Sequence, residues 1–189
     1  MKKFPIFCLA LLLFLPQSVW AAEFSIDSAH SRIMFKVPEL GVNLIGFFTQ
    51  CYGKITLSDD NSQLTSVDAT VHVSSVYTRN DKRDSDLRGP GIFDTAQFPE
   101  AHFVSKKIEG GKITGDLTIK GKTKPVVFTY TRGEVSQDQQ KNTKVALSAK
   151  GTISRKDYGI TYNRKLDGGK MLLGDEIELI LEIKAILKK

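Results

Sequence analysis

The chain has 189 residues, a formal net charge of +6, and basic and acidic residues in similar numbers, 27 against 21. This length suits one domain with a substantial hydrophobic core. The basic residues are scattered among acidic ones instead of gathering in one segment, which argues against a nucleic-acid-binding protein.

The first 22 residues have the pattern of a secretory signal peptide. Lys2 and Lys3 precede an apolar run, and "VWAA" (19–22) supplies small residues for cleavage. A membrane-spanning helix takes about 20 apolar residues, and this run is shorter. We therefore expect cleavage near Ala21 or Ala22, a mature domain of residues 23–189, and a periplasmic or secreted protein. The remaining net charge of +4 allows at most weak contact with an anionic membrane surface.

Nearly all of the remaining sequence alternates apolar and polar residues, which is typical of strands with one buried face. The eight segments that do so are "HSRIMFKV" (30–37), "FFTQCYGKITL" (47–57), "SVDATVHVSSV" (66–76), "HFVSKKI" (102–108), "KITGDLTIK" (112–120), "PVVFTYT" (125–131), "TKVALSAKGTIS" (143–154) and "EIELILEIKAIL" (176–187). Gly110 and Gly111 predict a tight hairpin between two of them. In "HFVSKKI", either Phe103 or Val104 could face the interior.

Eight long strands without a linker favour closure into a barrel, because closure removes the exposed sheet edges. A sandwich is the rival, although its strands tend to be shorter. We therefore predict an all-β protein, an eight-stranded antiparallel lipocalin-like barrel with a short helix across one end. Such a barrel is either filled by its own side chains or holds one small ligand.

The predicted helix lies in "TRNDKRDSDLRGPGIFD" (78–94), where charged residues interrupt the strand pattern. Thr78 and Asp81 resemble a capping box, and "GPG" (89–91) is a stop signal, so we expect a helix from about 79 to 88. Arg83 and Arg88 could present guanidinium groups to a ligand head at the barrel mouth. The alternative is a solvated helix whose charges pair locally, Asp84 with Arg88 and Lys82 with Asp86.

Residues for catalysis or metal binding are sparse. The sequence has no GxSxG, HExxH or glycine-rich phosphate loop, and its three histidines lack further ligands at metal spacing. His72 and His102 are expected to face solvent. Cys51 is the only cysteine beyond the signal segment, which excludes an intramolecular disulfide, and we expect it to be a small buried residue. We therefore predict no catalytic residue, no metal and no cofactor.

Several segments resemble those of one known family. "RDSDLRGPGIFD" (83–94) resembles the RDxHLRSxDFFD segment of the YceI-like family, exported lipocalin-like barrels described as polyisoprenoid-binding. "DSAHSRIMFKV" (27–37), "FPEAHFVS" (98–105) and "GDLTIKGKTKPV" (115–126) are similar to further segments of that family, in the same order. Asp86 and Glu39 stand where the family usually has histidine, which disfavours a phosphate-bearing head group and tolerates a quinone or a fatty amide.

The resemblance implies a protein that is not an enzyme and that sequesters or carries an isoprenoid, an isoprenoid quinone or another fatty-chain amphiphile. A homodimer is compatible with this role, whereas a nucleic-acid partner is not. The residues expected to bind the lipid are Ile33, Phe35, Val37, Phe47, Val71, Val73, Leu117, Ile119, Leu147 and Leu179 along the tail, Arg83 and Arg88 at the head, and Phe93, Phe98 and Tyr158 at the mouth.

Two alternatives remain. The first is a barrel with a filled core that acts through its surface as a stress-related or partner-binding protein. The second is a lipocalin-shaped enzyme, which ranks last because the strand phases place almost no titratable group inside. The connection at 155–173 could fold over the mouth or be mobile.

Overall fold

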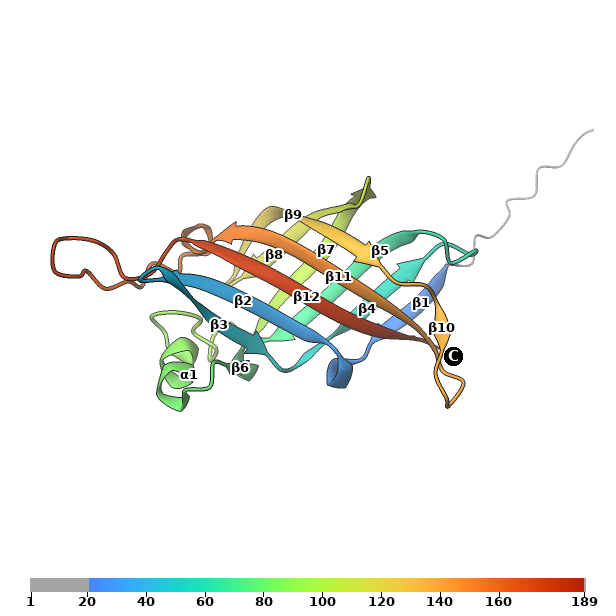
Figure 1. Ribbon diagram of the computed structural model, residues 1–189, viewed down its shortest axis with the longest axis horizontal. Coiled ribbons are helices and arrows are strands. Elements are labelled where there is room, and N and C mark those ends of the chain that lie inside the picture. The colour runs from blue at the N-terminus through green and yellow to red at the C-terminus, as the bar shows by residue number, and fades with distance from the viewer. Residues whose placement is uncertain (1–20, 189) are drawn as a thin grey trace, which may run out of the picture.

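Antiparallel strands close into a ring in the computed structural model, which describes residues 21–188 (Figure 1). The strands are β1 (Ala22–Ile26), β2 (Arg32–Glu39), β3 (Val42–Phe48), β4 (Cys51–Leu57), β5 (Leu64–His72), β6 (Val76–Tyr77), β7 (Glu100–Glu109), β8 (Lys112–Ile119), β9 (Lys122–Arg132), β10 (Ser136–Gln137), β11 (Thr143–Ser154) and β12 (Glu176–Leu187). The ring runs β1–β4–β5–β7–β8–β9–β11–β12 and back to β1. The predicted eight-stranded antiparallel barrel is confirmed.

Three of the eight strand positions are each built from two segments. β1 and β2 both pair with β12, at different points along it, and the 3-10 helix η1 (Ser28–His30) separates them. β4 and β3 form the second such position beside β1 and β2. β5 and the short β6 form the third, because β5 pairs with β4 and β6 pairs with β3. β1 was not predicted, although Phe24 in its centre is fully buried, and β3 and β4 were predicted as one strand.

The break between β3 and β4 changes which phenylalanine faces the interior. The chain interrupts its alternation at Thr49 and Gln50, and the inward positions are even-numbered in β3 but odd-numbered in β4. Because side chains alternate with a period of two, extending the phase of β4 backwards across such a break selects the wrong face. The prediction that Phe47 lies inside is therefore wrong, and Phe48 takes that place.

The alternation elsewhere is as predicted. On β11, Leu147 and Ala149 are buried while Ala146 and Lys150 are exposed. On β7, Phe103 faces the interior and Val104 faces outward, so of the two residues that the sequence left open it is Phe103 that lies inside.

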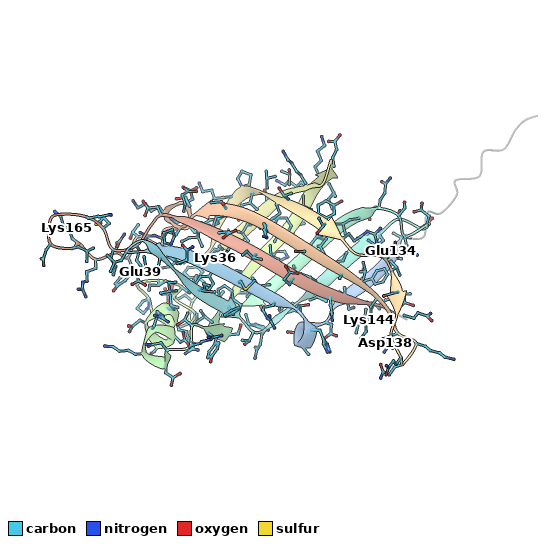
Figure 2. The ribbon with its side chains drawn as sticks, in the orientation of Figure 1. Lys36, Glu39, Glu134, Asp138, Lys144 and Lys165 are labelled. Carbon is cyan, nitrogen blue, oxygen red and sulfur yellow. The ribbon has the colours of Figure 1, made fainter. Side chains whose placement is uncertain are left out.

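The outer face of the barrel carries polar and charged side chains (Figure 2). Lys36 on β2 pairs with Glu178 on β12, with 2.9 Å between Nζ and Oε2. As predicted, His72 and His102 lie on this partly exposed face. His102 Nε2 lies 2.8 Å from Asp68 Oδ1. These contacts join neighbouring strands from outside and leave the interior to apolar residues.

The two ends of the barrel differ (Figure 1). The helix end carries α1 (Asp81–Arg88) and the connection from the 3-10 helix η3 (Arg155–Tyr158) to β12. The other end holds β1, the C-terminal end of β12, and the β7–β8 hairpin, where Gly110 and Gly111 both adopt positive φ, as the predicted tight turn requires. Among residues 21–188, no helix is long and apolar enough to cross a membrane.

The helix begins later than predicted, and another residue caps it. The N-cap is Asn80, whose Oδ1 accepts a hydrogen bond from the Arg83 backbone N–H at 2.9 Å. The proposed capping box of Thr78 and Asp81 is therefore wrong. The helix ends at Arg88 before Gly89, as the glycine–proline signal predicts.

Candidate binding cavity

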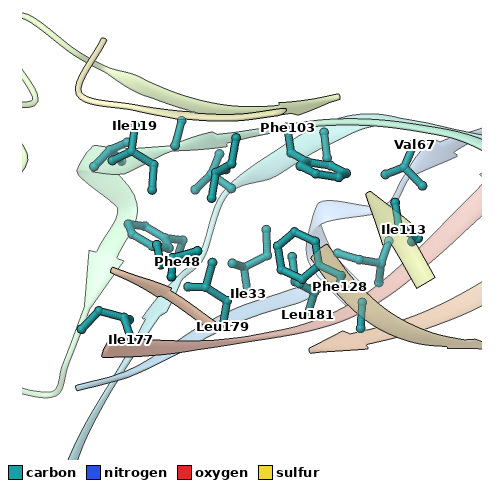
Figure 3. Close-up of a pocket in the computed structure, with 18 of the residues that line it drawn as sticks. Ile33, Phe48, Val67, Phe103, Ile113, Ile119, Phe128, Ile177, Leu179 and Leu181 are labelled. Atoms are coloured by element: carbon teal, nitrogen blue, oxygen red, sulfur yellow. The ribbon is translucent and has the colours of Figure 1, made fainter. Parts of the chain in front are cut away.

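The barrel encloses a cavity of about 150 Å³ that runs along its length (Figure 3). Ile119, Phe48 and Ile177 lie toward one end of it, and Val67 and Ile113 toward the other. Every lining residue except Arg155 and Tyr158 is apolar. A dry apolar cavity of about 150 Å³ is the size that accepts a benzene ring. The interior therefore holds a small free volume along an apolar path.

Most of the predicted tail and mouth residues face this cavity. Those that line it are Ile33, Val71, Val73, Phe93, Leu117, Ile119, Leu147, Tyr158 and Leu179. Three phenylalanines that were not predicted as site residues also line the cavity: Phe48, Phe103 and Phe128. The rings of Phe103 and Phe128 meet edge to face, with centroids 5.3 Å apart. Alternation indicated Phe128, it left Phe103 and Val104 open, and the break after β3 hid Phe48.

The other predicted site residues lie elsewhere. Phe35 is buried over Gly46, its cross-strand neighbour, and Val37 is half-buried in the wall near the end of β2. Phe98 lies against Gly121 in the β8–β9 turn. These three side chains support the barrel wall, and none of them lines the cavity.

The charged segment around α1 closes the barrel wall beside β6. Asp84 is buried and accepts hydrogen bonds from both the backbone N–H and the hydroxyl of Thr78. After the helix, the chain returns so that the Phe93 ring meets the Phe48 ring, with centroids 5.8 Å apart. The segment therefore brings an apolar side chain to the cavity and keeps its charged side chains out of the cavity lining.

The two arginines of this segment do not reach the cavity. Arg83 donates from Nε to the Thr78 hydroxyl and from Nη2 to the Thr78 carbonyl, each at 2.7 Å. Arg88 donates to the carbonyls of Ser74 and Val76, at 2.8 and 3.0 Å. The prediction that these guanidinium groups meet a ligand head is not supported by this geometry.

The local charge pairs of the alternative reading are also wrong. Among the ion pairs found in residues 21–188, none joins Asp84 to Arg88 or Lys82 to Asp86. Asp84 instead accepts from the backbone N–H and the hydroxyl of Thr78, and Arg88 donates to two backbone carbonyls outside the helix.

We expect an Arg88→Ala variant to lose stability and to keep its binding properties, the reverse of what a head-group role requires. Removing two charge-assisted hydrogen bonds from a partly exposed site should lower the free energy of unfolding by about 1 kcal/mol. Urea denaturation measures this change, and Lys82→Ala on the exposed face of the same helix serves as the control, with an expected change within about 0.5 kcal/mol. Weaker lipid binding at unchanged stability would restore the head-group role.

Arg155 is a buried cation at the cavity that was not predicted from the sequence. It is 5% exposed and lines the cavity. Its guanidinium donates to the carbonyls of Gly174, Ile160 and Tyr162 at 2.7–2.9 Å and to Asp175 Oδ1 at 2.8 Å. Asp175 also meets Lys156, whose ammonium group holds the pKa of Asp175 below its usual value. The signal was available, because Arg155 continues the inward phase of β11.

Tyr158, next to Arg155 in η3, is the second polar residue of the lining. Its side chain is 1% exposed, and its hydroxyl has no hydrogen-bond partner within the described residues. Burial raises the pKa of this hydroxyl to about 12, and the nearby Asp157 contributes. Tyr158 therefore stays a neutral hydrogen-bonding group at physiological pH.

The connection between η3 and β12 projects away from the barrel, as the position of Lys165 shows (Figure 2). Its base is held by Arg155 and by Asn163, whose side chain bonds both the N–H and the carbonyl of Leu173. Ile160 at this base lines the cavity. Of the segment 155–173, the start therefore lies over the helix end of the cavity, as one expectation had it, whereas the part around Lys165 projects away.

No metal-binding arrangement is found in the part of the chain that the structure describes: no three His, Cys, Asp or Glu side chains gather closely enough to hold an ion. Cys51 is free and 4% exposed, and burial raises the pKa of its thiol. This matches the expected small buried residue, and a raised pKa disfavours the reactive thiolate.

Comparisons with known proteins agree with this architecture. A family model described as YceI-like domain matches residues 24–185. A UPF0312 protein of Staphylococcus epidermidis is 36% identical over 160 residues, covering 82% of this chain and 92% of the relative. The crystal structure of Burkholderia cenocepacia BcnA superimposes with a TM-score of 0.71 at 22% identity, over 85% of this chain and 99% of that one. A polyisoprenoid binding domain from Saccharophagus degradans gives a TM-score of 0.67 at 14% identity, over 89% and 100%.

Proposed function

The chain belongs to the family of YceI-like domains, and from this premise we propose that it binds the apolar chain of an isoprenoid or similar lipid inside its barrel. The observation that carries the proposal is the continuous apolar lining of the axial cavity. Burial of apolar surface contributes roughly 25 cal/mol per Å², so a long chain binds firmly there with few polar contacts. The likeness to a solved polyisoprenoid binding domain is a second support.

The size of the cavity adds a condition to this proposal. A volume of about 150 Å³ holds a ring-sized group, so a long isoprenoid enters only if side chains along the path rotate and the barrel widens. The rival is the filled-core barrel that acts through its surface. It predicts a protein that carries no lipid and takes up none.

We also propose that the protein is exported and carries its lipid without acting on it as an enzyme. The predicted signal peptide lies outside the described residues except for Ala21 and Ala22. Weak membrane contact would occur at the helix end, where Leu40 and Val42 are 64% and 69% exposed and Met171 on the adjoining connection is also exposed. An isoprenoid quinone is compatible with the apolar interior. A homodimer is compatible with the outer surface of the barrel.

One experiment tests these proposals together. Cells that make the protein are separated into periplasmic, secreted and membrane fractions, and the purified protein is analysed by native mass spectrometry and organic extraction. We expect the mass of a chain without its first 21 or 22 residues, found outside the membrane fraction, with one long-chain lipid per barrel. The same spectrum reports monomer or dimer. An empty protein that also refuses added isoprenoids would favour the filled-core alternative.

A further inference from the structure

Tyr158 places an unsatisfied hydrogen-bonding group in the wall of an otherwise apolar cavity. Its ring lines the cavity, its side chain is 1% exposed, and its hydroxyl oxygen has no partner within the described residues. A buried hydroxyl without a partner costs free energy, whereas phenylalanine would fill the same space without that cost. A barrel that only needed a filled core at this position would gain stability by omitting the oxygen.

The neighbouring cation is already compensated. Arg155 is the only charged residue of the lining, and its guanidinium donates to three backbone carbonyls and to Asp175. Asp175 holds a second cation, Lys156, with 2.6 Å between Oδ2 and Nζ. An anionic head group entering here would meet a guanidinium that already uses four of its five N–H groups and whose charge is paired with Asp175, and it would lose its hydration.

The position of Tyr158 sets where a polar ligand atom would lie. η3 follows β11 directly, and Ile153 near the end of β11 pairs with Ile177 at the start of β12. Ile177 lies at one end of the cavity, opposite the end with Val67 and Ile113 (Figure 3). Tyr158 therefore belongs to the helix end, with the apolar path running away from it. In this structure its hydroxyl oxygen has almost no accessible surface, so it meets a ligand only when the widening that a long chain requires also uncovers it.

We propose that Tyr158 is a specificity-determining residue, and that its hydroxyl hydrogen-bonds to an uncharged oxygen of the ligand, a carbonyl, ether or hydroxyl, at the helix end. A tyrosine hydroxyl both donates and accepts, so each of these oxygens satisfies it. A phosphate or diphosphate head is disfavoured. This inference rests on the proposed function, since it assumes that a lipid chain occupies the barrel.

The test compares three C20 isoprenoid probes that share one skeleton: the hydrocarbon, the alcohol and the diphosphate. We expect wild-type protein to bind the alcohol more tightly than the diphosphate. Tyr158→Phe should weaken binding of the alcohol about fivefold, the size of one hydrogen bond, and leave binding of the hydrocarbon unchanged. Without ligand, the Tyr158→Phe variant should be at least as resistant to urea as the wild-type protein. Tyr130→Phe, a partly buried tyrosine outside the cavity lining, is the matched control.

The outcomes separate the two proposals. If the hydrocarbon binds and Tyr158→Phe leaves the alcohol-to-hydrocarbon ratio unchanged, the Tyr158 inference is overturned while lipid binding stands. If none of the probes binds wild-type protein, the proposed function itself fails. Should the variant not fold, the infrared carbonyl stretch of a C20 isoprenoid aldehyde decides the matter in wild-type protein. A shift to lower frequency than in hexane supports the hydrogen bond, and an unshifted band contradicts it.

Discussion

An Ala149→Phe variant is expected to lose lipid binding by about tenfold or more while it keeps the barrel fold. Ala149 lies on β11, is buried, and lines the cavity. A phenyl ring at this position would occupy much of a free volume of about 150 Å³. Overpacking a core typically lowers the free energy of unfolding by about 1–3 kcal/mol, so the barrel should survive while the path of the chain is blocked.

Ala146→Phe is the matched control for this prediction. Ala146 is on the same strand, three residues away, and faces outward. The substitution is chemically identical, so any loss of binding shared by both variants would reflect general damage. Titration with a fluorescent isoprenoid analogue measures binding, and urea denaturation measures stability. Wild-type affinity in Ala149→Phe would mean that the lipid does not occupy this cavity.

An Arg155→Met variant is expected to lower the free energy of unfolding by about 3 kcal/mol, the largest stability effect that we predict. Methionine keeps much of the aliphatic volume but removes the guanidinium. Three backbone carbonyls would then lose their donor at the base of the η3–β12 connection, and Asp175 would keep only Lys156. Carbonyls left without a donor beside a buried side chain cause most of the loss.

A Lys156→Met variant is the control that distinguishes the buried hydrogen bonds of Arg155 from its charge pair with Asp175. Lys156 contacts the same Asp175, but its side chain is 55% exposed, against 6% for Arg155. An exposed ion pair contributes roughly 0–1 kcal/mol, so this variant should change the urea midpoint little. Equal losses in the two variants would show that the charge pair with Asp175, and not the buried hydrogen bonds of Arg155, holds the connection.

Much of the fold was predictable because strand alternation is a local property. Side chains on a strand point to opposite faces in turn, so the residues of β11 and β12 identify their own inner face without reference to any partner. The glycine pair at the β7–β8 hairpin and the stop after Arg88 are equally local, since backbone dihedral preferences set them. The family resemblance rests on the same short segments.

The wrong predictions of inward-facing residues fall where the alternation of a strand is interrupted. The interruption of the strand at Thr49 and Gln50 reverses the phase and exchanges Phe47 for Phe48. Nothing local distinguishes such a break from a continuing strand, because both halves carry apolar residues at suitable spacing. The pairing of β3 with β2 and of β4 with β1 resolves it.

The sequence by itself determined most of the strands, their inward faces and the closure into an antiparallel barrel, because each follows from local alternation and from the need to hide sheet edges. Only the tertiary structure decided which polar groups meet. Arg88 reaches backbone carbonyls 12 and 14 residues away, Arg155 compensates Asp175 across the η3–β12 connection, and Tyr158 is left without a partner. Hydrogen bonds of this kind depend on distances that closure of the barrel creates.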